Sequence, residues 1–225
     1  MMNLEIEEKN VQIFPAQDTN TPIIYLNNYA HDGEKVYEAV LAAGCPDCTL
    51  VTVGKLKWDR DMTPWYTPPS SEHDTPCTGG ADDYLKILTE SIVPQVESSL
   101  GCKPAWRGIA GYSLAGLFAV YSIFHTDAFS RVGSMSGSLW FKDIKEYIFA
   151  HKLARVPDCM YFSLGDKESS SRISAFQCVQ DNTEAIEAFF RGKGIPTTYV
   201  LNRGSHYQKC NERTAAGIKW MLEQK

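Results

Sequence analysis

The chain has 225 residues, of which 44% are hydrophobic and 22% are charged, and its formal net charge is −5. This length fits one domain with one sizeable core, so we expect a single domain over residues 1–225. The composition excludes disordered and collagen-like classes, and without a polybasic block neither nucleic acid nor an anionic membrane is expected as a partner.

The N-terminal residues and the cysteines predict a cytoplasmic protein. The first eight residues carry three glutamates and no basic residue, whereas a secretion signal needs a basic start and an apolar run. Seven cysteines, an odd number, favour reduced thiols. Cys45 and Cys48 have the spacing of a redox or zinc pair, but a strand-like run follows them and no second pair would complete a zinc site. We therefore interpret them as part of a turn and expect no metal and no cofactor.

Strand-like apolar runs alternate with amphipathic helical stretches along the chain. In chain order the pattern predicts strands at 11–14 and 22–26, a helix at 33–43, a strand at 50–53, a helix at 81–100 bent at Pro94, a strand at 106–110, a helix at 114–124, a strand at 132–135, a helix at 142–150, a strand at 160–164, a helix at 175–191, a strand at 197–201 and a helix at 214–223. This alternation predicts an α/β fold with a mostly parallel central sheet and helices on both faces.

One uncharged stretch, residues 108–124, approaches the ~20 residues that a membrane span requires. It contains three glycines, two serines and two tyrosines, which favours a buried position in the domain over a membrane helix.

The long connection over residues 55–80 exceeds the usual length of a loop in a compact domain, and such loops often carry function. It holds Trp58, Arg60, Trp65 and Tyr66. Aromatic side chains on loops at the carboxyl ends of parallel strands are typical of a ligand cleft.

A nucleophile elbow is predicted where the strand at 106–110 meets the following helix. The residues Gly111-Tyr-Ser113-Leu-Ala115-Gly form a tight turn between strand and helix, and the small residues on either side satisfy its steric demand. Such a turn lifts the Ser113 hydroxyl clear of the sheet. It also places the Leu114 amide at a helix N-terminus, where it can stabilise an oxyanion.

A serine nucleophile requires a base, and His206 is the best-placed histidine. In α/β-hydrolases the chain order is serine, then acid, then histidine. His206 follows the last predicted strand and precedes the last helix, where the base of this fold lies. His125 and His151 lie at helix ends, where a structural role suffices.

The orienting acid is predicted just after the strand at 160–164. Both Asp166 and Glu168 lie there, and Asp143 is a more distant alternative. The second oxyanion amide should come from the loop after the strand at 22–26, and we assign it to Tyr29, within one residue either way.

With these residues the chain resembles the putative-esterase family of α/β-hydrolases, which includes enterochelin-esterase-like enzymes, feruloyl esterases and esterase D. The resemblance covers roughly residues 20–222 and rests on the elbow, the histidine loop and the segments at 22–26, 60–65, 79–86 and 136–140. In many relatives the acid is the fourth residue of a Gly-x-x-Asp/Glu turn. Glu168 fills that position after Gly165, so the resemblance implies Ser113, Glu168 and His206 as the catalytic residues.

The chain departs from the family pattern at two loops. Asn27-Asn28-Tyr29 stands where many relatives have an Asp-Gly type of oxyanion loop, and Gly204-Ser205-His206-Tyr207 stands where many have Gly-Gly-His. Within these 225 residues we expect no counterpart of the additional N-terminal domain of the larger enterochelin esterases.

The resemblance implies a serine carboxylesterase whose partner is a small-molecule ester with an acyl, aryl or siderophore-type group. Two alternatives remain at this point: an acyltransferase with the same residues, or a binding protein that keeps the fold. For the substrate pocket we expect contributions from Arg60, Trp65, Tyr112, Trp140 and Tyr207.

Overall fold

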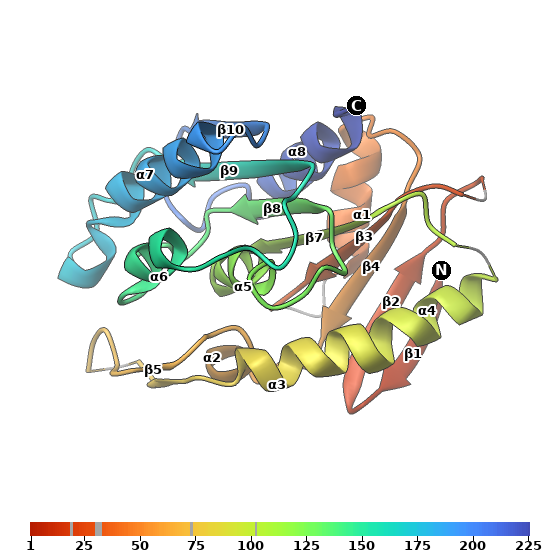
Figure 1. Cartoon of the computed structure of the whole chain (residues 1–225), viewed down its shortest axis with the longest axis horizontal. Helices are drawn as coiled ribbons and strands as arrows, with labels where there is room; N and C mark the ends of the chain where they lie inside the picture. The colour runs from red at the N-terminus through yellow and green to blue at the C-terminus, as the bar shows by residue number, and fades with distance from the viewer. Residues whose placement is uncertain (19, 30–32, 73, 102) are drawn as a thin grey trace.

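The computed structural model describes residues 1–18, 20–29, 33–72, 74–101 and 103–225. Within these residues, eight strands form one sheet in the order β1-β2-β4-β3-β7-β8-β9-β10 (Figure 1). The six strands from β4 to β10 are mutually parallel, and the β1–β2 hairpin joins antiparallel to β4. The strands are β1 (Met2–Ile6), β2 (Lys9–Phe14), β3 (Ile23–Asn27), β4 (Thr49–Gly54), β7 (Arg107–Tyr112), β8 (Arg131–Met135), β9 (Cys159–Gly165) and β10 (Thr197–Asn202).

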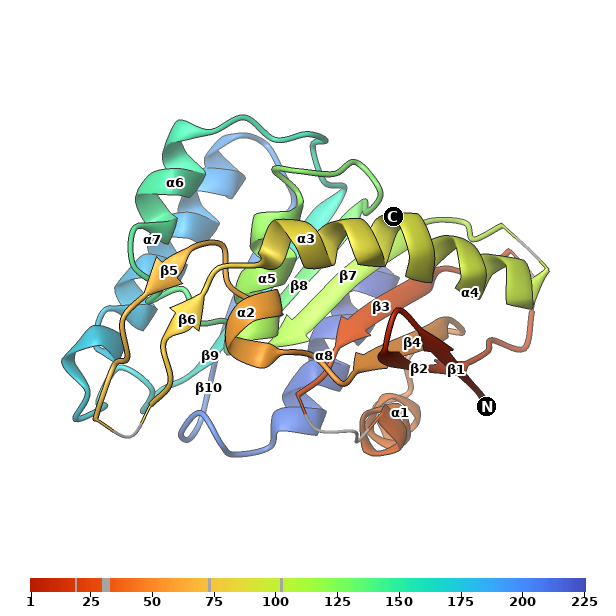
Figure 2. The same ribbon diagram turned by 90° about the horizontal axis from the view of Figure 1, so that it is seen from below.

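Helices cover both faces of the sheet, as predicted. One face is covered by α1 (Gly33–Ala42) and α8 (Cys210–Glu223), which pack on each other. Figure 2 looks onto the other face. That face is covered by α3 (Ala81–Lys86), η1 (Ile87–Ile92), α4 (Val93–Leu100), α5 (Leu114–Ser122), α6 (Ile144–Ala150) and α7 (Val179–Gly192).

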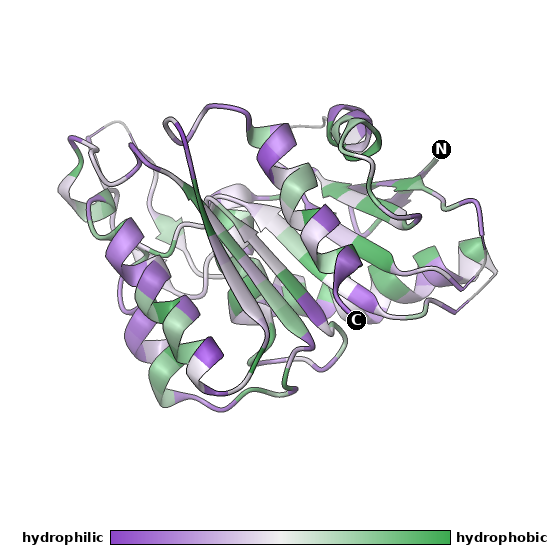
Figure 3. Ribbon diagram, turned by 90° about the horizontal axis from the view of Figure 1, so that it is seen from above, coloured by the Kyte–Doolittle hydropathy of each residue, from purple (hydrophilic) through white to green (hydrophobic). Residues whose placement is uncertain are grey.

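The sheet separates two hydrophobic cores because side chains alternate along each strand. On β3, Tyr25 packs into the core beneath α3 to α7, whereas Ile24 and Leu26 pack into the core beneath α1 and α8. In Figure 3 green residues are frequent along the central strands, and purple residues gather on the surrounding helices and loops. Burial on both faces explains why the parallel strands read as continuous apolar runs.

Several elements differ from the prediction, among them α7, which begins at Val179, four residues after the predicted start, and is preceded by the 3-10 helix η2 (Ser174–Phe176). Strand β1 was not predicted, and it pairs with β2 through a turn in which Glu7 and Glu8 have positive φ angles of 48° and 61°. The loop at 55–80 contains a short helix α2 (Trp58–Asp61) and a hairpin of β5 (Tyr66–Thr67) and β6 (Cys77–Thr78). Helix α8 begins at Cys210, four residues before the predicted start.

The helix predicted at 81–100 contains the π-helical segment η1 immediately before Pro94. Proline has no N–H to donate to the carbonyl of residue 90, and its ring would crowd that carbonyl in a regular α-helix. The wider π-helical turn thus lies next to Pro94, where the sequence predicted a bend in the helix.

The pair Cys45 and Cys48 lies in the connection between α1 and β4, as the turn interpretation expected. Burial raises the pKa of Cys45 to about 11 and that of Cys48 to about 12, which keeps both thiols protonated at neutral pH. Among the described residues, no helix is long and apolar enough to cross a membrane.

Candidate active site

Ser113 occupies a sharp turn between β7 and α5. Its φ angle of 62° and ψ angle of −127° are costly for a residue with a side chain, as a nucleophile elbow requires. The turn is held because the Ser113 carbonyl accepts hydrogen bonds from the amides of Gly116 and Ser138, at 3.0 Å each. A Cβ atom at Gly111 would lie 2.3 Å from the carbonyl carbon and oxygen of Ala115, so only glycine lets strand and helix approach this closely.

We expect Gly111→Ala to displace the elbow. The added methyl group would collide with backbone atoms, which have no rotamer to change, so the variant should lose about 1–3 kcal/mol of stability together with most of its ester turnover. Thermal unfolding and a p-nitrophenyl ester assay measure both effects. Gly192→Ala is the matched control because a Cβ there meets nothing within 4 Å. An active, equally stable Gly111→Ala protein would contradict this account of the turn.

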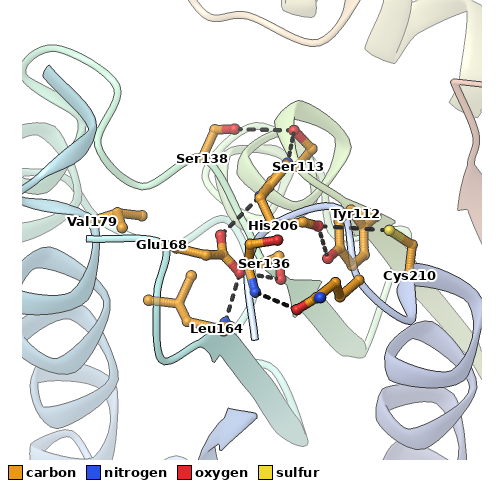
Figure 4. A network of polar contacts seen from close by, with 12 residues as sticks. Tyr112, Ser113, Ser136, Ser138, Leu164, Glu168, Val179, His206 and Cys210 are labelled. Carbon is orange, nitrogen blue, oxygen red and sulfur yellow. Dashed lines mark hydrogen bonds and ion pairs between the residues drawn. The ribbon is translucent and has the colours of Figure 1, made fainter. Parts of the chain in front are cut away.

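The structure brings Ser113, His206 and Glu168 together in a chain of hydrogen bonds (Figure 4). His206 Nε2 lies 3.0 Å from Ser113 Oγ, and His206 Nδ1 lies 2.8 Å from Glu168 Oε2. With its proton on Nδ1, the imidazole donates to the carboxylate and accepts from the serine hydroxyl. The three residues come from the carboxyl ends of β7, β9 and β10, where the parallel sheet predicts chemistry.

The Glu168 carboxylate is buried and surrounded by donors. Its Oε1 atom accepts hydrogen bonds from the Ser136 hydroxyl at 2.7 Å and the Gly165 amide at 2.6 Å. Burial alone would raise the pKa of Glu168. The opposing effects are larger and lower this pKa: they are the hydrogen bond from His206, the charge of its imidazole, and the hydrogen bonds from Gly165 and Ser136. Glu168 is therefore ionised at neutral pH and able to orient the imidazole.

Asp166, the alternative acid, has a different contact. Its Oδ1 atom accepts a 2.7 Å hydrogen bond from the amide of Gly204, and so ties the loop that carries His206 to the end of β9. Asp143 lies at the N-terminus of α6, where its carbonyl accepts from Tyr147. Of the three candidate acids, Glu168 is the one in contact with His206.

Replacing Glu168 with glutamine should lower kcat by about 10²- to 10⁴-fold. The glutamine side chain can keep its oxygen toward His206 only if its NH₂ group faces the Gly165 backbone N–H and Arg213. Both of these groups are donors, so the NH₂ group would have no acceptor there. In the opposite orientation the glutamine NH₂ group faces His206 Nδ1 and favours the tautomer with its proton on Nε2, which cannot accept the serine proton. Steady-state kinetics on a p-nitrophenyl ester give the value. Glu187→Gln, a change at a buried glutamate in α7, is the control, and equal activity of the two variants would remove Glu168 from the mechanism.

A polar cluster behind the histidine loop was not predicted from the sequence. The Tyr112 hydroxyl donates a 2.5 Å hydrogen bond to the His206 carbonyl, and the buried Arg213 contacts both Tyr112 and Glu168. Arg213 was missed because the last helix was predicted to begin at Thr214, one residue after it. An arginine seven residues after the candidate base His206 would have been the signal in the sequence.

The residues of the expected oxyanion amides line spaces next to Ser113, Tyr29 on one side and Leu114 on the other. Within the described residues, neither the Leu114 amide, at the start of α5, nor the Tyr29 amide donates to a protein acceptor. The Asn28 amide donates to the Val53 carbonyl at 2.9 Å, so it continues the sheet and is not available to a substrate. This leaves Leu114 and Tyr29 as the candidate donors predicted from the sequence.

Two hollows meet at Ser113 and His206. The first, of about 590 Å³, is bordered by Tyr29 and Tyr112 and reaches toward α1 and α8. The second, of about 610 Å³, is bordered by Trp140 and the loop at 136–138. Both are also lined by Trp58, Asp74 and Tyr207, and the Tyr207 side chain is largely exposed. The candidate nucleophile thus lies where two open spaces meet.

Two residues expected in the pocket lie elsewhere. Arg60 pairs with Asp61 at 3.2 Å and with Asp83 at 2.6 Å, and Trp65 donates from its indole nitrogen to the Lys142 carbonyl. Neither lines either hollow. The structure therefore assigns both to anchoring the 55–80 loop, in place of the expected contact with substrate. Trp58 of the same loop lines both hollows instead.

Comparison with known proteins places this geometry in a family. The model of the family described as "Putative esterase" matches residues 17–196. The uncharacterized protein YbbA of Bacillus subtilis is 24% identical over 209 residues, which cover 86% of this chain and 84% of YbbA.

Similar solved structures share the fold. The siderophore hydrolase EstA of Aspergillus nidulans superposes with a TM-score of 0.75 at 17% identity, covering 98% of this chain and 93% of EstA. An IroE-like serine hydrolase of Shewanella oneidensis superposes with a TM-score of 0.76 at 19% identity, covering 99% of this chain and 79% of the hydrolase. The enterobactin esterase FES of Shigella flexneri gives 0.72 at 17% identity, covering 99% of this chain and 58% of that longer protein. The match over most of its length shows that the chain belongs to the putative-esterase family, an esterase family with the α/β-hydrolase fold.

Proposed function

We propose that this protein is a serine carboxylesterase that forms an acyl-enzyme on Ser113. The observation that carries the proposal is the unbroken chain of hydrogen bonds from Ser113 through His206 to the buried Glu168 carboxylate. This is the arrangement that converts a weakly nucleophilic hydroxyl into an attacking group. Its location where two hollows meet supports cleavage of an ester with a group on each side.

In the first half of the proposed reaction, Ser113 Oγ attacks the ester carbonyl carbon while its proton passes to His206 Nε2. The negative charge that develops on the carbonyl oxygen is stabilised by the amides of Leu114 and Tyr29. The C–O bond to the alcohol then breaks, and the leaving oxygen takes the proton from His206. An acyl group remains bound to Ser113, and Glu168 holds the imidazole in the required tautomer throughout.

In the second half, water replaces the alcohol. His206 Nε2 removes a proton from the water as its oxygen attacks the acyl carbon, and the same proton returns to Ser113 Oγ when the acid departs. The enzyme is regenerated without a cofactor or metal. An acyltransferase would follow the same steps with an alcohol in place of water.

The aromatic border of the two hollows supports substrates with an acyl, aryl or siderophore-type group. Trp58 and Tyr207 line both spaces, and Trp140 lines the second. Two structural neighbours are siderophore hydrolases by name and another is an enterobactin esterase, which supports including siderophore-type esters among the substrates to be tested. We also propose a reducing, cytoplasmic setting, supported by six free cysteines in the described part of the chain.

Stopped-flow hydrolysis of p-nitrophenyl acetate and butyrate tests the proposal. An acyl-enzyme predicts a burst of p-nitrophenol that approaches the enzyme concentration when deacylation is much slower than acylation, followed by steady turnover. A parallel panel of feruloyl, formyl-thioester and catecholate-lactone esters assigns the substrate class. Addition of acceptor alcohols distinguishes a transferase, which would form new esters at the expense of free acid. A protein without burst or turnover on every ester would refute the proposal and favour the binding-protein alternative.

A further inference from the structure

Arg213 is a buried cation behind the candidate active site. It lies in the first turn of α8, and its side chain is 3% exposed. Its Nη1 atom lies 3.3 Å from Glu168 Oε1, Ser136 Oγ and the Tyr112 hydroxyl, and its Nη2 atom lies 3.3 Å from the Arg203 carbonyl. A Cβ at Gly165 would lie 3.0 Å from both terminal nitrogens, so the guanidinium packs directly on the end of β9.

The contacts of Arg213 lead to His206 by separate routes. Glu168 holds the imidazole through Nδ1, and the Tyr112 hydroxyl holds the backbone of the same residue through its carbonyl. The Arg203 carbonyl belongs to the loop that delivers the histidine to the cleft. One planar guanidinium therefore contacts three groups that hold His206. They are Glu168, which binds the imidazole ring, Tyr112, which binds the backbone carbonyl, and Arg203, which lies at the start of the histidine loop.

The chemistry of arginine fits this arrangement. A guanidinium has five N–H donors in a fixed plane and keeps its charge when buried, whereas an ammonium is a compact group on a flexible chain. The charge also matters, because Glu168 is a buried carboxylate and a buried charge is costly unless it has an opposite charge nearby. Arg213 therefore supplies both the positive charge that balances the Glu168 carboxylate and the fixed donors that its neighbours accept from.

We propose that Arg213 is a positioning residue that fixes His206 in line with Ser113 through Glu168, Tyr112 and the Arg203 carbonyl. This inference rests on the proposed function, since it concerns the alignment of the same nucleophile and base. Arg213 has no contact with Ser113 or with the two hollows, so its effect is on the chemical steps and not on substrate binding.

Two variants of Arg213 test the proposal. For Arg213→Met, which removes the charge and all donors, we expect kcat on p-nitrophenyl butyrate to fall about 10- to 100-fold, because small misplacements of a base have effects of this size. KM should stay within about twofold. Arg213→Lys keeps the charge but cannot span the four acceptors, so its kcat should lie between those of Arg213→Met and wild type. The rate constant for labelling by a fluorophosphonate, which reports serine reactivity, should fall in parallel with kcat.

A matched control separates positioning from a general loss of stability. Arg131 on β8 is also buried, and it donates to the carbonyls of Met221 and Gln224 at the other end of the sheet. Arg131→Met should lower the unfolding temperature while leaving kcat and the labelling rate of the folded protein unchanged. Equal kinetic losses in the Arg131 and Arg213 variants would indicate a purely structural effect and overturn the proposal.

A double-mutant cycle with Glu168→Gln gives a test that does not depend on the single variant folding. Glu168→Gln with Arg213→Met removes both buried charges together, and adding Arg213→Met to Glu168→Gln should cost less than Arg213→Met costs in wild type, since positioning through the carboxylate is already lost while the Tyr112 and Arg203 contacts are lost only then. A full additional 10- to 100-fold loss would contradict this. Absence of labelling at Ser113 in wild type would refute the proposed function itself, whereas wild-type labelling rates in the Arg213 variants would overturn only the inference about Arg213.

Discussion

Replacing Ser113 with alanine should lower kcat on a p-nitrophenyl ester by about 10⁴- to 10⁶-fold. The variant loses the oxygen that attacks the carbonyl, while the oxyanion amides and both hollows remain. The fold should persist, because the contacts that hold the turn are made by the Ser113 backbone, whose amide donates to the Met135 carbonyl at 3.1 Å. Steady-state kinetics and thermal unfolding of the same preparation measure both properties.

The control for this variant is Ser122→Ala, at the far end of the same helix α5. Ser122 donates to the Ala119 carbonyl and does not line either hollow. It should keep wild-type kcat. Substantial ester turnover in Ser113→Ala, at a rate above that of the buffer alone by more than about 10⁴-fold, would mean that another group is the nucleophile.

His206→Ala is the second change for which we expect a very large effect, a loss of kcat of about 10⁴-fold or more. Without the imidazole no group removes the serine proton. The loop itself should stay in place, because Tyr112 binds the backbone carbonyl of residue 206 and Asp166 binds the Gly204 amide. Adding Ser113→Ala to His206→Ala should cause little further loss, since the two residues act as one unit. A multiplicative loss in the double variant would count against a shared mechanism.

Acidification should lower the esterase activity for the same reason as His206→Ala, but reversibly. A protonated imidazole cannot accept the serine proton, so kcat/KM should fall as the pH is lowered. The lowered pKa of Glu168 means that its carboxylate is still ionised where this loss begins. His125→Ala is the matched control, because His125 pairs with the Tyr147 hydroxyl away from both hollows, and its profile should equal that of wild type. A profile that is flat from pH 5 to 8 would argue against a histidine base.

The parts of the site that local sequence determines were predictable. The elbow around Ser113 lies between an apolar strand and a helix that immediately follows it, and the small residues it needs are adjacent in the sequence. The alternation of strands and helices likewise predicted the parallel sheet, and with it the edge at which the functional loops meet. The fold class is confirmed by the family match and the structural neighbours.

The parts that depend on distant partners were not predictable. Strand β1 alternates weakly in burial, and the buried Lys9 next to it is compensated by Asp61, 52 residues away. Trp58 and Trp65 are aromatic residues of one loop, and nothing in their spacing indicates that the first lines the cleft and the second anchors the loop. Arg213 contacts acceptors on four separate segments, so its environment exists only in the folded chain.

Covalent labelling by a fluorophosphonate shows which residue is the reacting nucleophile, and we expect it to be Ser113. Wild-type protein treated with one equivalent of a fluorophosphonate should gain the mass of a single adduct, lose its ester turnover in proportion, and yield the adduct on the peptide that contains Ser113 after proteolysis. His206→Ala should be labelled far more slowly under the same conditions. An inactivating adduct on any other residue, or full inactivation without an adduct at Ser113, would contradict the account.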